Sequence, residues 1–330
     1  RRSEDKRLYG FSEMYKCFDH GEVVVKTAAE WLGISFRTLN PEQPRGWADA
    51  VLSELYEVDG VRILLYSQQN FYRYNAGAYE QVDEGVIRAD SSEVLEKYSL
   101  VSEKGPRPFP VTNAKMQEVV AALRDKCNVD RYGTEPPTWL VDGKGYDPEK
   151  IIAFRNGLYY VPTGEFLPPT PHFFTLNALE IDYDPNAPKP TEWLKFLHKL
   201  WGKGNDPGGF NWEGDDWEGD DWEGDDSCIQ TLQEWFGYLL LPDTTQQKIM
   251  LMVGPKRSGK GTIARTLKAV VGHKNTGNPT LNTLGQRFGL EDLIGKTAAT
   301  ITDIRLSGRT DVASVAERLL SVSGEDSITI

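Results

Sequence analysis

Apolar residues recur with the period of an α-helix between Asn113 and Cys127. The apolar positions form one stripe, which consists of Met116, Val119, Val120, Leu123 and Cys127. A stripe of this kind is typical of a helix that faces a hydrophobic core. We therefore predict a helix over Asn113–Cys127, with Asn113 as its N-terminal cap.

A different pattern lies between Val61 and Val82, where β-branched and aromatic residues are frequent. This stretch predicts paired β-hairpins, with Asn75-Ala76-Gly77 as a turn. Its aromatic residues are Phe71, Tyr72, Tyr74 and Tyr79. They could stack on nucleic-acid bases, but a half-buried sheet face explains them more simply.

Residues 1–60 are expected to be mostly helical. Within them, Thr27–Ser35 has the cadence of a helix-turn-helix, although Pro41 and Pro44 would end a recognition helix soon afterwards. A DNA-reading helix and an ordinary packed helix both remain open. Further along, Glu103–Pro110 has the proline content of a linker. Amphipathic patterns predict two more helices, over Trp193–Leu200 and Ile229–Leu240.

The chain has 330 residues and a net charge of −12, which first argues against a nucleic-acid partner. However, the three consecutive WEGDD units at 212–226 carry nine of the acidic residues. This period does not match a calcium-binding loop, so we interpret the repeat as a tandem duplication in a surface loop. From Leu251 to Ile330 there are 11 Lys and Arg against 7 Asp and Glu, which is compatible with a polyanionic partner.

The three cysteines, Cys17, Cys127 and Cys228, are dispersed and form no C-x-x-C pair. This usage predicts reduced thiols in a cytosol-like, cytoplasmic compartment. No apolar run approaches the roughly 20 residues of a membrane span, so no membrane association is expected. The chain begins without methionine, and we expect it to be a fragment.

The stretch GPKRSGKGT, Gly254–Thr262, follows the G-x-x-x-x-G-K pattern of a phosphate-binding loop. The apolar run Lys248–Gly254 predicts a buried parallel strand before it, and Thr262–Gly272 predicts a helix after it. Strand, glycine-rich loop and helix are the context in which this pattern binds phosphates. The position after Lys260 is Gly261 rather than the usual Ser or Thr, with Thr262 one step later.

The loop assigns roles to individual residues. Its glycines let backbone N–H groups turn toward the phosphates of ATP, and Lys260 reaches the outer phosphates as a point charge. Either Thr262 or Ser258 supplies the hydroxyl near Mg²⁺. The expected nucleotide-binding set is Gly254, Pro255, Ser258, Gly259, Lys260, Gly261 and Thr262.

A phosphate-loop enzyme also needs an acidic residue at the end of a neighbouring strand to hold Mg²⁺. The β-prone run Lys296–Arg305 offers Asp303 for this role. The residue after Asp303 is Ile304, so the base that activates water is unassigned. Its candidates are Glu317, Glu325 and Asp326.

Several stretches occur in the order found in phage and plasmid primase–helicase proteins, and the chain resembles that family. Phe154–Leu197 is similar to the domain named after the poxvirus D5 protein. SCIQTLQEWFGYLLLPDTTQQKIMLMVGPKRSGKGT is similar to the junction between that domain and the motor. LIGKTAATITDIRLSGRTDVASVAERLLSVSGEDSITI is similar to the segment that carries the magnesium acid and the next motor motif. The resemblance is clear from about residue 150 onward, loose over 60–150 and absent before residue 60.

The resemblance implies an α/β fold with a superfamily 3 helicase motor of the RecA- or AAA+-like type, truncated at its C-terminal end. The expected domains are a helical segment (1–60), an α+β D5-type domain (61–245) and the ATPase domain (246–330). The motor would form a ring around DNA, usually a hexamer, and work with a primase domain or protein. The residues expected to contact DNA or a neighbouring subunit are Arg305, Arg309 and Arg318.

Three departures keep other readings open. First, Gly261-Thr262 replaces the usual Ser or Thr pair after the lysine of the phosphate loop. Second, the polar sensor and the arginine finger expected of the motor are not found before Ile330. Third, no primase catalytic domain is visible in these residues. The chain could therefore be an ATP-binding assembly module that does not hydrolyse ATP. The sequence G-K-G-T also occurs in adenylate-kinase-like enzymes, but those usually begin with the loop. A replication motor is the reading that fits best.

Overall fold

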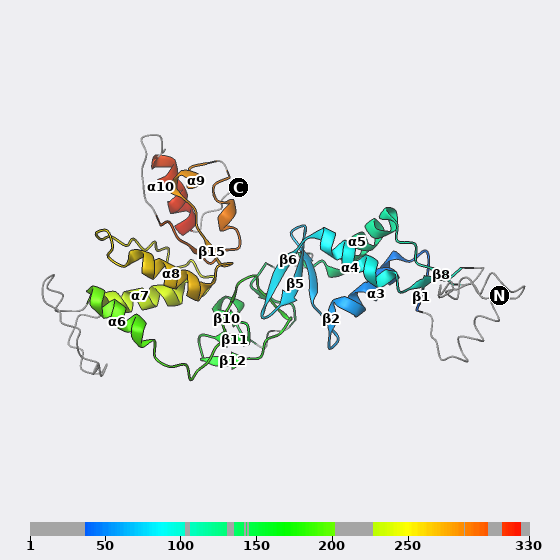
Figure 1. Ribbon diagram of the computed structural model, residues 1–330, viewed down its shortest axis with the longest axis horizontal. Helices are drawn as coiled ribbons and strands as arrows, with labels where there is room; N and C mark the ends of the chain where they lie inside the picture. The colour runs from blue at the N-terminus through cyan, green and yellow to red at the C-terminus, as the bar shows by residue number, and fades with distance from the viewer. Residues whose placement is uncertain are drawn as a thin grey trace, which may run out of the picture. The chain divides into compact units, whose positions relative to one another are not determined.

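A computed structural model describes residues 37–102, 106–130, 135–141, 143, 145–201, 227–286, 288–302 and 312–324. These residues form a mixed α/β structure with several small sheets (Figure 1). They divide into two compact units. The first contains the described residues up to Glu135 except Ala76–Ala78, and the second contains those three and the described residues from Pro136 onward.

Three helices form the core of the first unit. They are α3 (Pro44–Leu55), α4 (Glu84–Leu95) and α5 (Asn113–Cys127). Pro44 is placed in the first turn of α3, where its missing N–H costs nothing. Asp83 caps α4 by accepting a hydrogen bond from the Gly85 N–H at 2.7 Å. The apolar faces of the three helices meet around Trp47, Ile87 and Val119, which are almost fully buried.

Short strands surround these helices. Two of the sheets are three-stranded, with the orders β4-β5-β6 and β1-β7-β8, and β2 and β3 form a small antiparallel pair. The strands are β1 (Thr38–Leu39), β2 (Glu57–Val58), β3 (Val61–Arg62), β4 (Leu64–Ser67), β5 (Asn70–Asn75), β6 (Ala78–Val82), β7 (Ser99–Leu100) and β8 (Arg107–Pro108). The predicted hairpins are therefore confirmed, including the turn at Ala76-Gly77. A second turn at Gln68-Gln69, where both residues have positive φ, had not been predicted.

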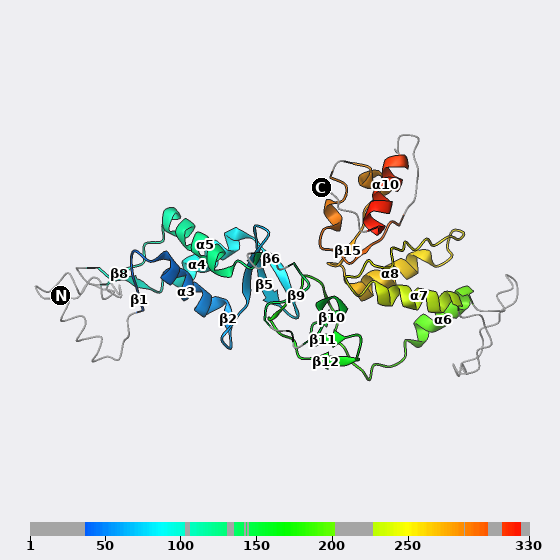
Figure 2. The same ribbon diagram turned by 180° about the vertical axis from the view of Figure 1, so that it is seen from behind.

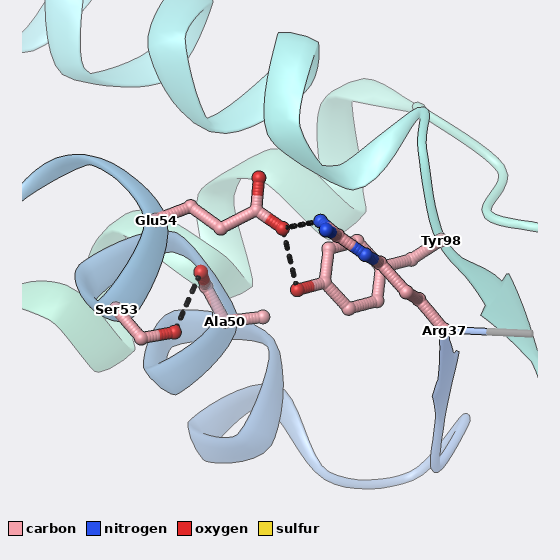
Figure 3. A network of polar contacts seen from close by, with 5 residues as sticks. All are labelled: Arg37, Ala50, Ser53, Glu54 and Tyr98. Atoms are coloured by element: carbon pink, nitrogen blue, oxygen red, sulfur yellow. Dashed lines mark hydrogen bonds and ion pairs between the residues drawn. The ribbon is translucent and has the colours of Figure 1, made fainter. Parts of the chain in front are cut away.

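A polar contact ties β1 and β7 to α3 in this unit (Figure 3). The carboxylate of Glu54 accepts a hydrogen bond from the Tyr98 hydroxyl at 2.8 Å and also pairs with the Arg37 guanidinium. Burial and the bond to Glu54 raise the pKa of Tyr98 above its ordinary value. Glu54 thus joins the chain before β1 and the chain before β7 to one helix.

Two sequence predictions in this unit need correction. The helix Asn113–Cys127 and its buried stripe are confirmed, but the cap is Thr112, whose hydroxyl accepts from the Lys115 N–H. The expected linker Glu103–Pro110 includes β8 and Phe109, and Phe109 lies 5.1 Å from Trp47, centroid to centroid, in an edge-on contact. Prolines are tolerated in edge strands, and an aromatic side chain between them secures the segment to the core.

The second unit begins with a four-stranded sheet of order β12-β11-β10-β14, in which β10 and β14 are parallel. Two further pairs are β9 with β13, antiparallel, and β15 with β16, parallel. The strands are β9 (Thr138–Trp139), β10 (Ile151–Phe154), β11 (Gly157–Tyr160), β12 (Glu165–Leu167), β13 (Phe173–Phe174), β14 (Ala178–Leu179), β15 (Thr276–Gly277) and β16 (Ala298–Ala299).

The longer helices of this unit are α6 (Thr191–Trp201), α7 (Ser227–Tyr238), α8 (Lys260–Val271) and α10 (Val312–Ser323). Shorter ones are α9 (Leu281–Leu284), η2 (Pro148–Lys150) and η3 (Glu291–Leu293). Helices α6, α7 and α8 lie together around a shared apolar cluster (Figure 2). The three helices predicted near residues 193–200, 229–240 and 262–272 are confirmed, each within a few residues.

The run Lys248–Gly254, predicted to be a buried parallel strand, is not a strand. Its side chains do alternate between packed and exposed positions. Met250 and Met252 pack on the cluster of α6, α7 and α8. The intervening Ile249, Leu251 and Val253 are 58, 69 and 86 % exposed. A buried strand needs a hydrogen-bonded neighbour on each side, and no described strand is paired with this run.

The run Lys296–Arg305 forms only the short strand β16, parallel to β15. The larger parallel sheet expected of a RecA-like motor stays a prediction. The possible helix-turn-helix at 27–35 and the acidic repeat at 212–226 lie outside the described residues. Within the part of the chain that is described, no helix is long and apolar enough to cross a membrane.

Candidate functional site

The phosphate-loop candidate leads directly into α8. Gly259 occupies the N-cap position with φ +79°, in the left-handed region, and α8 starts at the next residue. A side chain at position 259 is disfavoured for a second reason, since a Cβ there would lie 2.9 Å from both Leu200 Cδ1 and Phe196 Cζ. The positive φ therefore favours glycine here, and any side chain would also require the ends of Leu200 and Phe196 to shift. Arg257 also has positive φ, so two residues of the loop share this conformation.

Lys260 holds the loop closed on itself. Its ammonium group donates to the carbonyl oxygens of Gly254 and Pro255, each at 2.8 Å, and to Ser258 Oγ at 3.1 Å. These bonds use all three donors of a lysine side chain. Among the described residues, no carboxylate forms an ion pair with Lys260. In the described part of the chain, the hydrogen-bond acceptors of this half-buried ammonium are uncharged oxygens.

The first glycine of the pattern makes room for these contacts. A Cβ at Gly254 would lie 2.8 Å from Ser258 Oγ and 3.9 Å from Lys260 Nζ. A side chain there would displace Ser258, whose hydroxyl is one of the three acceptors of the ammonium.

The two candidate hydroxyls have different partners. Ser258 Oγ is bonded to Lys260, whereas Thr262 Oγ1 accepts a hydrogen bond from Arg265 Nη2 at 3.2 Å. Arg265 also lies beside Gly261, where a Cβ would be 3.5 Å from Arg265 Nη1. Arg265 was not among the residues predicted for the site. Its position three residues after Thr262 on a helix was the signal that could have found it.

The other predicted site residues are not brought to the loop by the described structure. Asp303, Arg305, Arg309, Glu325 and Asp326 lie outside the described residues. Arg318 donates to the carbonyl oxygens of Leu284, at 2.6 Å, and Gln286, so it ties α10 to the end of α9. Glu317 is exposed on α10. Within the described ranges, no group of three or more His, Cys, Asp or Glu could hold a metal ion.

An open pocket of about 460 Å³ lies beside α7, away from the loop. Trp235, Tyr238 and Met250 contribute to its lining, and Glu234 and Lys248 lie at the same pocket. None of its lining residues falls within 254–262. Loop residues 254–257 are exposed, and residues 258–260 are half-buried.

Comparison with known proteins finds a family match for the region before the loop. Residues 51–202 match the family model described as D5 N terminal like. The stretch Phe154–Leu197 lies entirely inside this match, so its resemblance to a D5-type domain is confirmed. D5-type domains are found in phage and viral primase–helicase proteins, which fits a role in DNA replication. No curated protein matches the chain.

Proposed function

We propose that this chain, whose residues 51–202 are a D5-type N-terminal domain, is part of an ATP-driven DNA helicase of phage or plasmid replication. The observation that carries the proposal is the ammonium of Lys260, which sits at the start of α8 and has no carboxylate partner among the described residues. A nucleotide polyphosphate would supply the negative charge that this group lacks.

The loop has the other features that a polyphosphate needs. The N–H groups of the first turn of a helix point out of its start, where the helix dipole places partial positive charge; at α8 the Thr262 N–H is already bonded to the Gly259 carbonyl oxygen at 2.9 Å. The left-handed turn at Gly259 brings the chain into α8 without a side chain at the point of entry. Lys260 would exchange its bonds to Gly254 and Pro255 for bonds to the outer phosphates. These properties favour ATP as the ligand.

For Mg²⁺, the fit is carried by the hydroxyl groups of Thr262 and Ser258 and, by sequence, by Asp303. Hydroxyl and carboxylate oxygens are the ligands that Mg²⁺ accepts in phosphate-binding sites. When bound, Mg²⁺ neutralises charge that develops on the phosphates during hydrolysis. Thr262 Oγ1 and Ser258 Oγ each accept one hydrogen bond, from Arg265 and Lys260, and each hydroxyl oxygen keeps a second lone pair for a metal ion.

The proposal extends to DNA. The mild positive charge from Leu251 onward suits a polyanion. We propose Arg305, Arg309 and Arg318 as contacts to DNA or to a neighbouring subunit of a ring, with a primase domain or protein as partner. Arg318 bonds to two carbonyl oxygens through Nη1, so a contact to DNA would use its other guanidinium N–H groups.

The test is ATP hydrolysis by the full-length protein, measured with and without single-stranded DNA. Lys260→Ala is the inactive control, and AMP is offered as a competing phosphate acceptor. The proposal predicts hydrolysis that DNA stimulates and that the variant lacks. Transfer of phosphate to AMP with no DNA effect would identify a nucleotide kinase instead. Binding without either activity would leave an ATP-binding assembly module.

A further inference from the structure

Helix α6 connects the D5-type domain to the loop. It lies within the family match, yet its apolar face packs on α7, α8 and the run before the loop. Leu197 is completely buried in this cluster. Trp193 stacks on Phe196 with ring centroids 5.4 Å apart, and it lies 6.0 Å from Phe236 of α7. Helix α6, the last element of the matched region, is therefore part of the apolar cluster that also contains Ile263 of α8.

Two side chains of α6 contact the loop at its most constrained point. Phe196 and Leu200 approach so closely that a Cβ at Gly259 would lie 2.9 Å from each of them. Gly259 is also the left-handed residue that turns the chain into α8. Movement of either side chain would change the space available to this turn, and with it the direction of the N–H groups that follow.

The opposite end of α8 is held by a second part of the D5-type domain. The side-chain amide of Asn275 donates to the Val271 carbonyl oxygen of α8 at 2.8 Å and to the Ala178 carbonyl oxygen of β14 at 3.0 Å. Its Oδ1 accepts a hydrogen bond from Asn177 Nδ2 at 3.3 Å. Asn275 is 2 % exposed, so water does not compete strongly for these bonds.

Between its two ends, α8 is packed along one face. Ile263, Leu267 and Val271 are spaced four residues apart and are all buried. Residues four apart lie on the same side of a helix, so this face is continuous. Close-packed interiors have low compressibility and transmit strain. Displacement of α6 or β14 would therefore be transmitted to the loop at the start of α8.

We propose that the D5-type domain positions the phosphate loop, with Phe196 and Leu200 of α6 as positioning residues that set the turn at Gly259. This inference rests on the proposed nucleotide-binding function. It adds that nucleotide affinity depends on side chains that never touch the nucleotide. Because coupling between two sites is reciprocal, nucleotide binding in turn stabilises α6 and the segment around Asn275.

The first test compares nucleotide affinity among α6 variants of the full-length protein, by titration with Mg²⁺–ATP. Leu200→Ala should bind ATP about tenfold more weakly than the wild type, within the range of measured coupling between sites. Leu200→Met, which restores most of the volume, should recover affinity to within about threefold. The matched control is Leu194→Ala, because Leu194 is half-buried on the same helix but lies outside the cluster around the loop.

A purely structural role for Leu200 predicts a different result. Thermal unfolding would then shift in Leu200→Ala while the folded protein bound ATP as the wild type does. Equal affinity of Leu200→Ala and wild type would overturn the inference and leave the proposed function intact. If the wild type itself does not bind ATP, the proposed function fails and the inference falls with it.

The second test needs no variant and decides the matter if Leu200→Ala does not fold. Amide hydrogen exchange of the wild type is measured with and without Mg²⁺–ATP. The inference predicts slower exchange in α6 and around Asn275 on addition of nucleotide, with no change in α5 of the first unit. Slower exchange in residues 254–262 without any change in α6 would overturn it.

Discussion

The side-chain amide of Asn275 donates a hydrogen bond to the backbone carbonyl oxygen of Ala178 across 3.0 Å. The two residues are far apart in the sequence, and Ala178 belongs to the matched D5-type region whereas Asn275 follows α8. Because the same amide also donates to the Val271 carbonyl oxygen, Asn275 links β14 of the sheet β12-β11-β10-β14 to the end of α8. The matched D5-type region and the region that contains the loop are thus joined by the hydrogen bonds of one buried asparagine.

Replacement of Asn275 by Ala should destabilise the second unit by about 1–3 kcal/mol. The change removes the donor to Ala178 and Val271 and leaves their buried carbonyl oxygens without this partner. Urea unfolding monitored by circular dichroism measures the effect. Asn186→Ala, at an exposed position, is the control and should lie within about 0.5 kcal/mol of the wild type. Equal stability of the two variants would show that the Asn275 bonds contribute nothing net.

The two described cysteines should react with alkylating reagents at very different rates. Cys127 is buried, and burial raises the pKa of its thiol to about 12, so the reactive thiolate is scarce at pH 8. Cys228 is exposed on α7. Iodoacetamide labelling of the native protein, followed by peptide mass mapping, should modify Cys228 first and Cys127 only after denaturant is added. Rapid native labelling of Cys127 would contradict the packing of α5.

The stability of the first unit should fall as the pH rises above about 10, the ordinary pKa of tyrosine. Burial, followed by the hydrogen bond to Asp90 at 2.6 Å, raises the pKa of Tyr56 in the folded protein. The unfolded chain therefore loses this proton at a lower pH than the folded chain. The contribution is complete below the unfolded pKa and is lost as the pH increases toward the folded value, by at most about 1.4 kcal/mol per pH unit.

Tyr56→Phe isolates this contribution, because phenylalanine does not titrate. Urea unfolding of the variant and the wild type at pH 8, 10 and 11 should give a difference in unfolding free energy that narrows as the pH rises. A difference that stays constant over this range would mean that Tyr56 titrates at the same pH in both states.

The sequence pattern predicted those helices and turns that depend on interactions between residues close together in the chain. The apolar stripe of α5 and the Ala76-Gly77 turn were readable because their causes lie within a few residues. The strand predicted at Lys248–Gly254 was wrong, since a strand depends on neighbours that the run itself does not encode. Phe109 was likewise misjudged, because its partner Trp47 is distant in the sequence.

In the candidate site, too, local features were predicted from the sequence, whereas contacts between distant residues were not. The roles of Gly259 and Lys260 are predicted from the loop pattern alone, and the structure places both at the start of α8. The contact of Phe196 and Leu200 with Gly259 could not be read from the sequence, because it depends on how α6 packs. The partnership of Arg265 with Thr262 could have been found from helical spacing, although the pattern itself does not include position 265.

If the ammonium of Lys260 belongs to a nucleotide site, calorimetric titration of Mg²⁺–ATP should distinguish the wild type from Lys260→Ala. Loss of a charge-assisted bond to phosphate should weaken binding by at least about tenfold. Lys268→Ala, at the other end of α8, is the matched control and should bind as the wild type does. Equal ATP affinity of Lys260→Ala and wild type would contradict the proposal that Lys260 binds the nucleotide.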